Sequence, residues 1–177
     1  MQDKEELLSK IQLLHLKIGH AFYRLAFNYI NKGFKIEKRE FDRERIKNII
    51  RIQNLANSYS LADERYYLTD WQTWKKIIKY DWIDKKKYHR DYFDCDNFAF
   101  VFSANASFFY GLNSCGVAFG VINKEYAHCF NVIFALENEK VKTIIYEPIR
   151  DGFVEYDQGK PIKIGNWTYK INWLFMF

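Results

Sequence analysis

The feature that most constrains this chain of 177 residues is a long apolar stretch between Asp94 and Gly111. Placed on a helix, the residues from Cys95 to Tyr110 put apolar side chains on nearly every side. Asp94 is a favourable residue for capping the start of a helix, and Gly111 is favourable for ending one. A helix without a polar face must be covered all round, so we expect a buried central helix with Cys95 in its first turn.

The residues before this segment also show helical periodicity. Apolar residues recur every three or four positions from Leu7 to Leu25, with Gly33 as the expected C-cap, and a second helix is expected from Phe41 to Ala56. Together they predict an N-terminal helical hairpin in residues 1–63, packed on the rest of the chain or on a second copy. A short helix is expected over 70–80, with Thr69 as its N-cap.

The part that follows the central helix reads as β-structure, with Glu137-Asn138-Glu139-Lys140 as the clearest hairpin. Strands are expected at residues 117–122, 126–136, 141–149, 152–156, 162–164 and 167–175. Helices first and strands afterwards predict an α+β fold in which an antiparallel sheet packs against the central helix. Residues 64–177 would form the core of a single compact domain.

Composition excludes several classes of protein. Apolar residues make up 49% of the chain and proline occurs twice, which excludes disorder and low complexity. The three cysteines show no C-x-x-C spacing, so a disulfide scaffold is not expected. The polar N-terminus lacks a signal peptide pattern, and no apolar run reaches the roughly 20 residues of a membrane span. We therefore expect a cytoplasmic protein that makes no membrane contact.

Cys95 is a candidate nucleophile, because a helix N-terminus stabilises a thiolate. Its candidate base is His128, which lies inside an expected strand. If the hairpin loop has two or four residues, Leu136 pairs with Val141, and Glu147 then projects to the same side as His128. The strand pattern therefore predicts that Glu147 orients His128.

Two metal ions can be considered for these residues. Zinc is disfavoured, because the adjacent residues His128 and Cys129 point to opposite faces of a strand and cannot both reach one ion. Asp94 and Asp96 flank Cys95, and their carboxylates are ligands that Ca²⁺ prefers. These two carboxylates are expected either to bind a calcium ion or simply to face solvent.

These residues resemble a known family. Phe-Asp-Cys-Asp-Asn-Phe-Ala at the start of the apolar helix, then Ala-His-Cys-Phe-Asn and Tyr-Glu-Pro, are similar to the papain-like cysteine hydrolase superfamily. The similar groups are the NlpC/P60 and transglutaminase-like proteins and the peptidase domain of mushroom agglutinins. The resemblance covers roughly residues 64–156.

The resemblance implies a papain-like fold and a thiol protease, a cysteine peptidase or amidase that acts on a peptide or amide substrate. Cys95 would be the catalytic nucleophile, His128 the base and Glu147 the orienting group, and Tyr88 would supply an oxyanion donor. No cofactor would be required. A transglutaminase-like acyl transfer is the alternative within the same resemblance.

A different class of function is a non-catalytic binding module. Between Arg65 and Arg90, basic residues alternate with aromatic ones, a pattern typical of proteins that bind nucleic acid through phosphate contacts and base stacking. The net charge of +5 permits this partner without requiring it. Binding to another protein, or to a second copy through the N-terminal helices, is also compatible with the sequence.

Overall fold

The computed structural model describes residues 12–15, 17–19, 21–22, 25, 29 and 36–177. The chain forms two units, Met1–Lys35 and Ile36–Phe177. The described residues of the first unit are helical. The rest of the first expected helix, including Gly33, lies outside the described residues. Most of the N-terminal helical surface that was expected to bind a second copy lies there too. The division expected at residue 63 stays a prediction.

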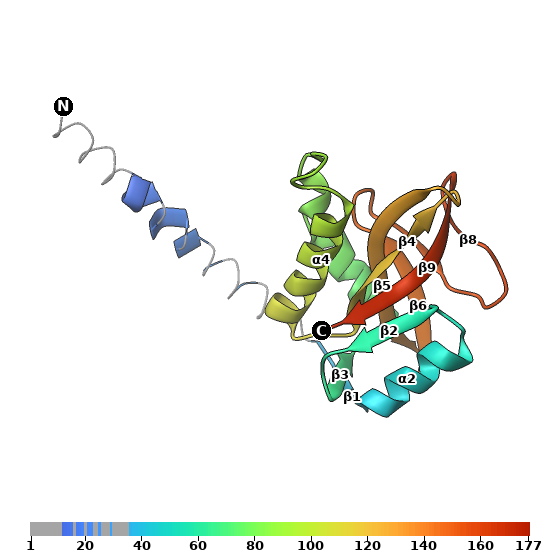
Figure 1. The fold of residues 1–177 in the computed structure, drawn as a ribbon. Helices are drawn as coiled ribbons and strands as arrows, with labels where there is room; N and C mark the ends of the chain where they lie inside the picture. Colours follow the sequence, from blue (N-terminus) through green and yellow to red (C-terminus); the bar gives the residue numbers. More distant parts are fainter. Residues whose placement is uncertain (1–11, 16, 20, 23–24, 26–28, 30–35) are drawn as a thin grey trace. The chain divides into compact units, whose positions relative to one another are not determined.

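The second unit is a mixed α and β structure built around one large sheet (Figure 1). Its strands are β1 (Arg39–Asp42), β2 (Ser58–Leu61), β3 (Arg65–Leu68), β4 (Cys115–Ile122), β5 (Tyr126–Glu137), β6 (Lys140–Glu147), β7 (Gly152–Glu155), β8 (Ile162–Ile164) and β9 (Trp167–Met176). The large sheet has the order β2-β9-β4-β5-β6-β7, with β8 paired to β9, and β1 and β3 form a separate pair. The strands expected after the central helix are therefore confirmed, with small changes at their ends.

The sheet differs from the expected one at β2, which pairs in parallel with β9. The other pairings are antiparallel. Residues 58–61 carry no signal for this pairing, because the partner strand lies at the far end of the chain and no turn joins the two. An entirely antiparallel sheet was therefore a wrong expectation at this edge.

The helices are α2 (Arg43–Ile52), α3 (Trp71–Tyr80) and α4 (Cys95–Tyr110), with a short 3₁₀ turn at Ile83–Lys85. The helix expected from Phe41 begins only at Arg43, because Asp42 caps it and the residues before Asp42 pair with β3. Asp70, rather than Thr69, caps α3: its carboxylate accepts a hydrogen bond from the Thr73 N–H at 2.9 Å.

The expected helix is confirmed as α4, which begins at Cys95 after the N-cap Asp94. The expectation that it is covered on every side was wrong, because Ala104 and Phe108 on it are exposed. Gly111 ends it in the left-handed conformation, with φ of 60°. The helix packs on the middle of the sheet, against β4 and β5 (Figure 1). It therefore brings Cys95 to the central strands of the sheet.

Strand β5 is buried on both faces, which positions the residues at its start. On one face, Cys129 packs with Ala99 of α4 and Val117 of β4. On the other, Phe130 and Val132 join a larger core with buried residues of α2, β1 and β3. Because successive side chains of a strand alternate between faces, β5 connects both halves of the core. Among the helices that the structure describes, none has the length and hydropathy of a bilayer span.

Candidate functional site

Cys95 occupies the first position of α4, where backbone N–H groups have no partner within the helix. The start of the helix is held by Asn97, whose side-chain oxygen accepts a hydrogen bond from the Asp94 N–H at 3.1 Å. The thiol is half-buried and free. It therefore combines the positive end of a helix dipole with partial access to solvent, two conditions for a reactive thiolate.

His128 and Glu147 meet through the hairpin of β5 and β6. The two-residue turn Asn138–Glu139 has positive φ at both positions, and Leu136 pairs with Val141 as expected. Nε2 of His128 lies 2.6 Å from Oε2 of Glu147. The contact expected from the hairpin register is confirmed.

Glu147 is fully buried, so its charge needs partners inside the protein. Besides His128, the Tyr169 hydroxyl donates to Oε2 at 3.0 Å, and the Ile149 N–H donates to Oε1 at 3.3 Å. These donors fix the carboxylate in one orientation. The carboxylate can then hold the imidazole in one orientation as well.

Aromatic rings enclose His128. Phe130, Trp167 and Tyr169 place their ring centroids 6.2, 5.9 and 6.1 Å from that of the imidazole. The guanidinium of Arg150 lies over the Trp167 ring, 3.7 Å from its centroid. The rings exclude water from the imidazole, which is only 7% exposed, and this strengthens its interaction with Glu147.

A second thiol, Cys129, lies in the small cluster against which Cys95 packs. The two thiols are close enough to shift each other's pKa. The sequence carries no signal for this contact. Strand alternation predicts that His128 and Cys129 point to opposite faces of β5, yet both contribute to the lowered pKa of Cys95.

The electrostatics favour a thiolate beside an imidazolium. Hydrogen bonding to Cys129 and then to His128 lowers the pKa of the Cys95 thiol to about 4, although burial opposes the shift. For His128, burial acts to lower the pKa, but hydrogen bonds to Cys95 and Glu147 outweigh it and raise the pKa to about 9. Hydrogen bonding to Cys95 raises the pKa of Cys129, which therefore stays protonated as a donor. The lowered pKa of Cys95 and the raised pKa of His128 together favour a thiolate–imidazolium ion pair near neutral pH.

Tyr88, the expected oxyanion donor, is close enough to Cys95 for the thiolate charge to contribute to its raised pKa, after burial as the larger cause. Its ring stacks on that of Phe98 in α4, with centroids 6.5 Å apart. Neither contact shows where the Tyr88 hydroxyl would donate during a reaction. Its role as an oxyanion donor stays a prediction.

The carboxylates beside Cys95 interact with each other. A hydrogen bond to Asp96 is the main cause of a raised pKa at Asp94, followed by burial. Within the ranges that the structure describes, no group of three or more His, Cys, Asp and Glu side chains is arranged to hold a metal ion. A calcium ion at Asp94 and Asp96 remains a prediction.

The basic and aromatic stretch from Arg65 to Arg90 is divided by the fold. Tyr66, Trp71 and Trp74 belong to the core, so they cannot stack on a ligand. Trp82 and Tyr88 are exposed, at 76% and 48%. The rings of this stretch that can be presented to a partner are therefore Tyr67, Tyr80, Trp82 and Tyr88.

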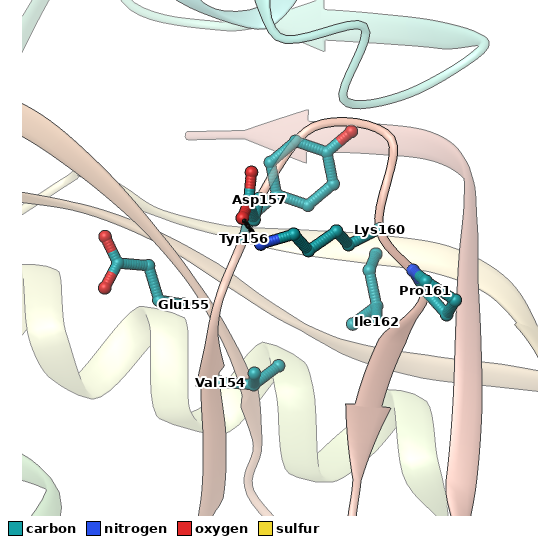
Figure 2. A pocket seen from close by; sticks show the side chains of 7 residues that line it. All are labelled: Val154, Glu155, Tyr156, Asp157, Lys160, Pro161 and Ile162. Carbon is teal, nitrogen blue, oxygen red and sulfur yellow. Dashed lines mark ion pairs between the residues drawn. The ribbon is translucent and has the colours of Figure 1, made fainter.

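A separate hollow of about 560 Å³ lies at the connection between β7 and β8 (Figure 2). It is lined by Val154, Glu155, Tyr156, Asp157, Lys160, Pro161 and Ile162. The Tyr156 hydroxyl donates to the Gln53 carbonyl at 3.0 Å, and Lys160 pairs with Asp157 at 2.5 Å. In this hollow, the Tyr156 ring is held in one orientation beside the ion pair of Lys160 and Asp157.

Comparisons with known proteins identify similar structures but no family. No family model matches the chain, and no curated protein matches it. One similar solved structure is the "PSL1a-E64 complex", with a TM-score of 0.57 and 17% identity over 77% of this chain and 51% of that chain. Another is a Polyporus squamosus lectin bound to the human-type influenza-binding epitope Neu5Acα2-6Galβ1-4GlcNAc, with a TM-score of 0.53 and 17% identity over 66% of this chain and 48% of that chain. The chain therefore spans about half the length of these structures, and the likeness is one of fold.

These comparisons correct the family expected from the sequence. The structures that share the fold carry the name of a lectin, and no family model supports a papain-like assignment. The resemblance depended on three short motifs and on the order Cys, His, Glu. Such motifs are too short to specify a superfamily, and the same residues occur on unrelated folds.

The expected activity is corrected with the family. Lectin structures do not support a cysteine peptidase, an amidase, a transglutaminase-like enzyme or a peptide substrate. The alternative of a non-catalytic binding module agrees better with them. The roles expected for Cys95, His128, Glu147 and Tyr88 are not decided by the comparisons and stay predictions.

Proposed function

We propose that this chain is a binding module whose ligand is held at the centre formed by Cys95, His128 and Glu147. The Cys95 thiolate would attack an electrophilic carbon of the ligand, since the thiolate is the nucleophilic form of cysteine. An S–C bond forms, a C–O bond of the ligand opens, and its oxygen stays on the ligand and takes the proton of the His128 imidazolium. The observation that carries this proposal is the 2.6 Å contact of His128 with a fully buried Glu147, beside a thiol whose pKa is lowered. Turnover of the ligand is not part of the proposal.

The surroundings of Cys95 supply the non-covalent part of binding. Tyr88 stacks on α4 one turn after Cys95, and its ring is about half exposed. Exposed aromatic rings bind planar and apolar groups of ligands. One of the similar structures is a complex of PSL1a with E64, which supports a small-molecule ligand on this fold.

The test is adduct formation between the full chain and E64, followed by intact mass spectrometry. We expect one adduct per chain in the wild type and none in Cys95→Ser. Cys115→Ser is the matched control, because Cys115 is fully buried and outside the centre, and it should react like the wild type. An adduct that survives Cys95→Ser, or none in a wild type whose Cys95 accepts iodoacetamide, would contradict the proposal.

A second candidate function is glycan binding in the hollow between β7 and β8 (Figure 2). Two observations favour it: a similar structure is a lectin with a bound glycan, and the hollow holds the oriented ring of Tyr156 beside polar side chains. A sugar ring can pack against an aromatic ring face, and its hydroxyl groups can form hydrogen bonds with charged side chains. Calorimetry with Neu5Acα2-6Galβ1-4GlcNAc should then show binding to the wild type. Tyr156→Ala should abolish this binding, whereas the control Lys163→Ala, at an exposed position of β8, should preserve it. No binding to the wild type would exclude this candidate.

A further inference from the structure

The meeting of two thiols at the start of α4 is not used by the proposed function. Cys95 and Cys129 come from different elements: Cys95 packs against the cluster that contains Cys129, and each thiol shifts the pKa of the other. Cys95 is half-buried, whereas Cys129 is only 8% exposed. An oxidant from solvent would therefore reach Cys95 before it reaches Cys129.

We propose that Cys95 and Cys129 form a reversible disulfide after a peroxide oxidises Cys95, and that this disulfide closes the binding centre. Redox-sensitive cysteines are accessible thiolates that lie next to a resolving cysteine. Both conditions are met by this pair. The inference goes beyond the proposed function, because it requires no ligand.

The first step consumes the peroxide. The Cys95 thiolate attacks one peroxide oxygen, so that an S–O bond forms and the O–O bond breaks. The leaving hydroxide takes a proton from the His128 imidazolium and becomes water. Cys95 is then a sulfenic acid, and His128 is neutral.

The second step forms the disulfide. The Cys129 sulfur attacks the Cys95 sulfur, so that an S–S bond forms and the S–O bond breaks. The leaving hydroxide takes the Cys129 proton and becomes water. Overall, the two thiols are oxidised to one disulfide, and one peroxide is reduced to two waters.

Cys115 provides an internal control for this chemistry. It is fully buried in β4, burial raises the pKa of its thiol, and the Ser103 hydroxyl donates to its backbone carbonyl oxygen. A buried, protonated thiol reacts slowly with peroxide. Cys115 should therefore stay reduced under conditions that oxidise Cys95.

The test treats the reduced full chain with hydrogen peroxide, without any ligand, and maps its peptides under non-reducing conditions. In the wild type we expect a mass loss of two hydrogens, one crosslinked peptide pair containing Cys95 and Cys129, and loss of iodoacetamide labelling at Cys95. Dithiothreitol should restore the labelling. Cys115→Ala should behave in the same way.

Cys129→Ala separates the two steps. In this variant we expect a Cys95 sulfenic acid that dimedone traps, followed by oxidation that dithiothreitol does not reverse. The wild-type crosslink is measured without any variant, so the inference can be tested even if Cys129→Ala folds poorly. Irreversible oxidation of wild-type Cys95 without the crosslink, or Cys95 that remains reduced, would overturn the inference, whereas failure of E64 to bind would leave it standing.

Discussion

At the scale of single residues, the centre depends on the buried carboxylate of Glu147. A buried charge is tolerated only when it is paired and hydrogen-bonded, and Glu147 has His128, Tyr169 and the Ile149 N–H as partners. Glu147 in turn helps to raise the pKa of His128. The charge on the imidazole, and with it the thiolate at Cys95, thus depends on a residue that acts through His128.

This dependence predicts the effect of Glu147→Gln. Without the carboxylate, one of the hydrogen bonds that raise the pKa of His128 is lost, so the pKa of His128 should fall and that of Cys95 should rise. Below its pKa, the thiolate population falls roughly tenfold per pH unit, so the pH at which alkylation of Cys95 sets in should move upward, and alkylation at about pH 5 should slow by a few-fold or more. The measurement is the rate of iodoacetamide labelling by mass spectrometry. Glu125→Gln, in the exposed turn before β5, is the control and should leave this rate unchanged.

Cys95, His128 and Glu147 could be predicted from the sequence as one centre. The presence of Cys129 beside Cys95 could not. Cys95 was indicated by the capped apolar helix, and the contact of His128 with Glu147 followed from the parity of one short turn. The contact between Cys95 and Cys129 has no sequence signal, because it depends on where the start of α4 meets β5. Pairing of β5 with β6 stops at Asn131, so the first residues of β5 lie beyond the ladder with β6.

At the scale of elements, the pairing of β4 with β9 contains an irregularity between Phe119 and Gly120. Gly120 pairs with His128 on its other side, so its position affects the centre. A Cβ atom at Gly120 would lie 1.9 Å from the Lys170 carbonyl oxygen, closer than any real contact. The close approach of β9 therefore requires glycine here.

Gly120→Ala should consequently destabilise the protein. We expect a loss of about 1–3 kcal/mol in the free energy of unfolding, because the backbone of β9 must move to admit the methyl group. Urea denaturation followed by tryptophan fluorescence measures this loss. Gly19→Ala, at a helical position with open space around it, is the matched control and should not destabilise. Equal stability of the two variants would contradict this account of β4 and β9.

Helix α4 is tied to the sheet by Asn131, which is fully buried in β5. Its side-chain nitrogen donates to the Ala99 carbonyl at 2.9 Å and to the Gly116 carbonyl at 3.1 Å. One side chain thus links α4, β4 and β5. The start of α4 is held at the sheet by this link together with the packing of Ala99.

Removal of this link should be measurable as a loss of stability. For Asn131→Ala we expect about 1–3 kcal/mol, the cost of leaving buried polar groups without their partners. Gln72→Ala, on the exposed side of α3, should change the free energy of unfolding by less than about 0.5 kcal/mol. Chemical denaturation of both variants gives the comparison, and a loss at Asn131 no larger than that at Gln72 would argue against the link.

At the scale of the whole molecule, residues 36–63 contribute to the same core as the strands of the large sheet. Phe41, Ile46 and Ile50 pack in one cluster with Phe130 of β5. The sequence indicated the amphipathic helix but not the strands on either side of it, because β1 and β2 are four residues each and pair with distant partners. Short strands of this kind become visible only in the folded chain.

This shared core predicts how the chain can be divided. A fragment of residues 36–177 should fold and keep the wild-type melting temperature and labelling of Cys95, because it contains the second unit in full. A fragment of residues 64–177 should fail to fold, because it lacks three large buried side chains of the core. Circular dichroism and thermal melting of the two fragments distinguish these outcomes. A folded 64–177 fragment would instead support a boundary at residue 63.

The central claim is that Cys95 is a thiolate paired with the His128 imidazolium at neutral pH. The most direct test is the rate of iodoacetamide alkylation of Cys95 in the full chain, measured by mass spectrometry from pH 3 to 10. Because the pKa of Cys95 is lowered to about 4 and that of His128 is raised to about 9, the rate should rise near pH 4 and stay level until about pH 9. A rate that remains low at pH 7 and rises only near pH 9, as for a free cysteine, would contradict the account.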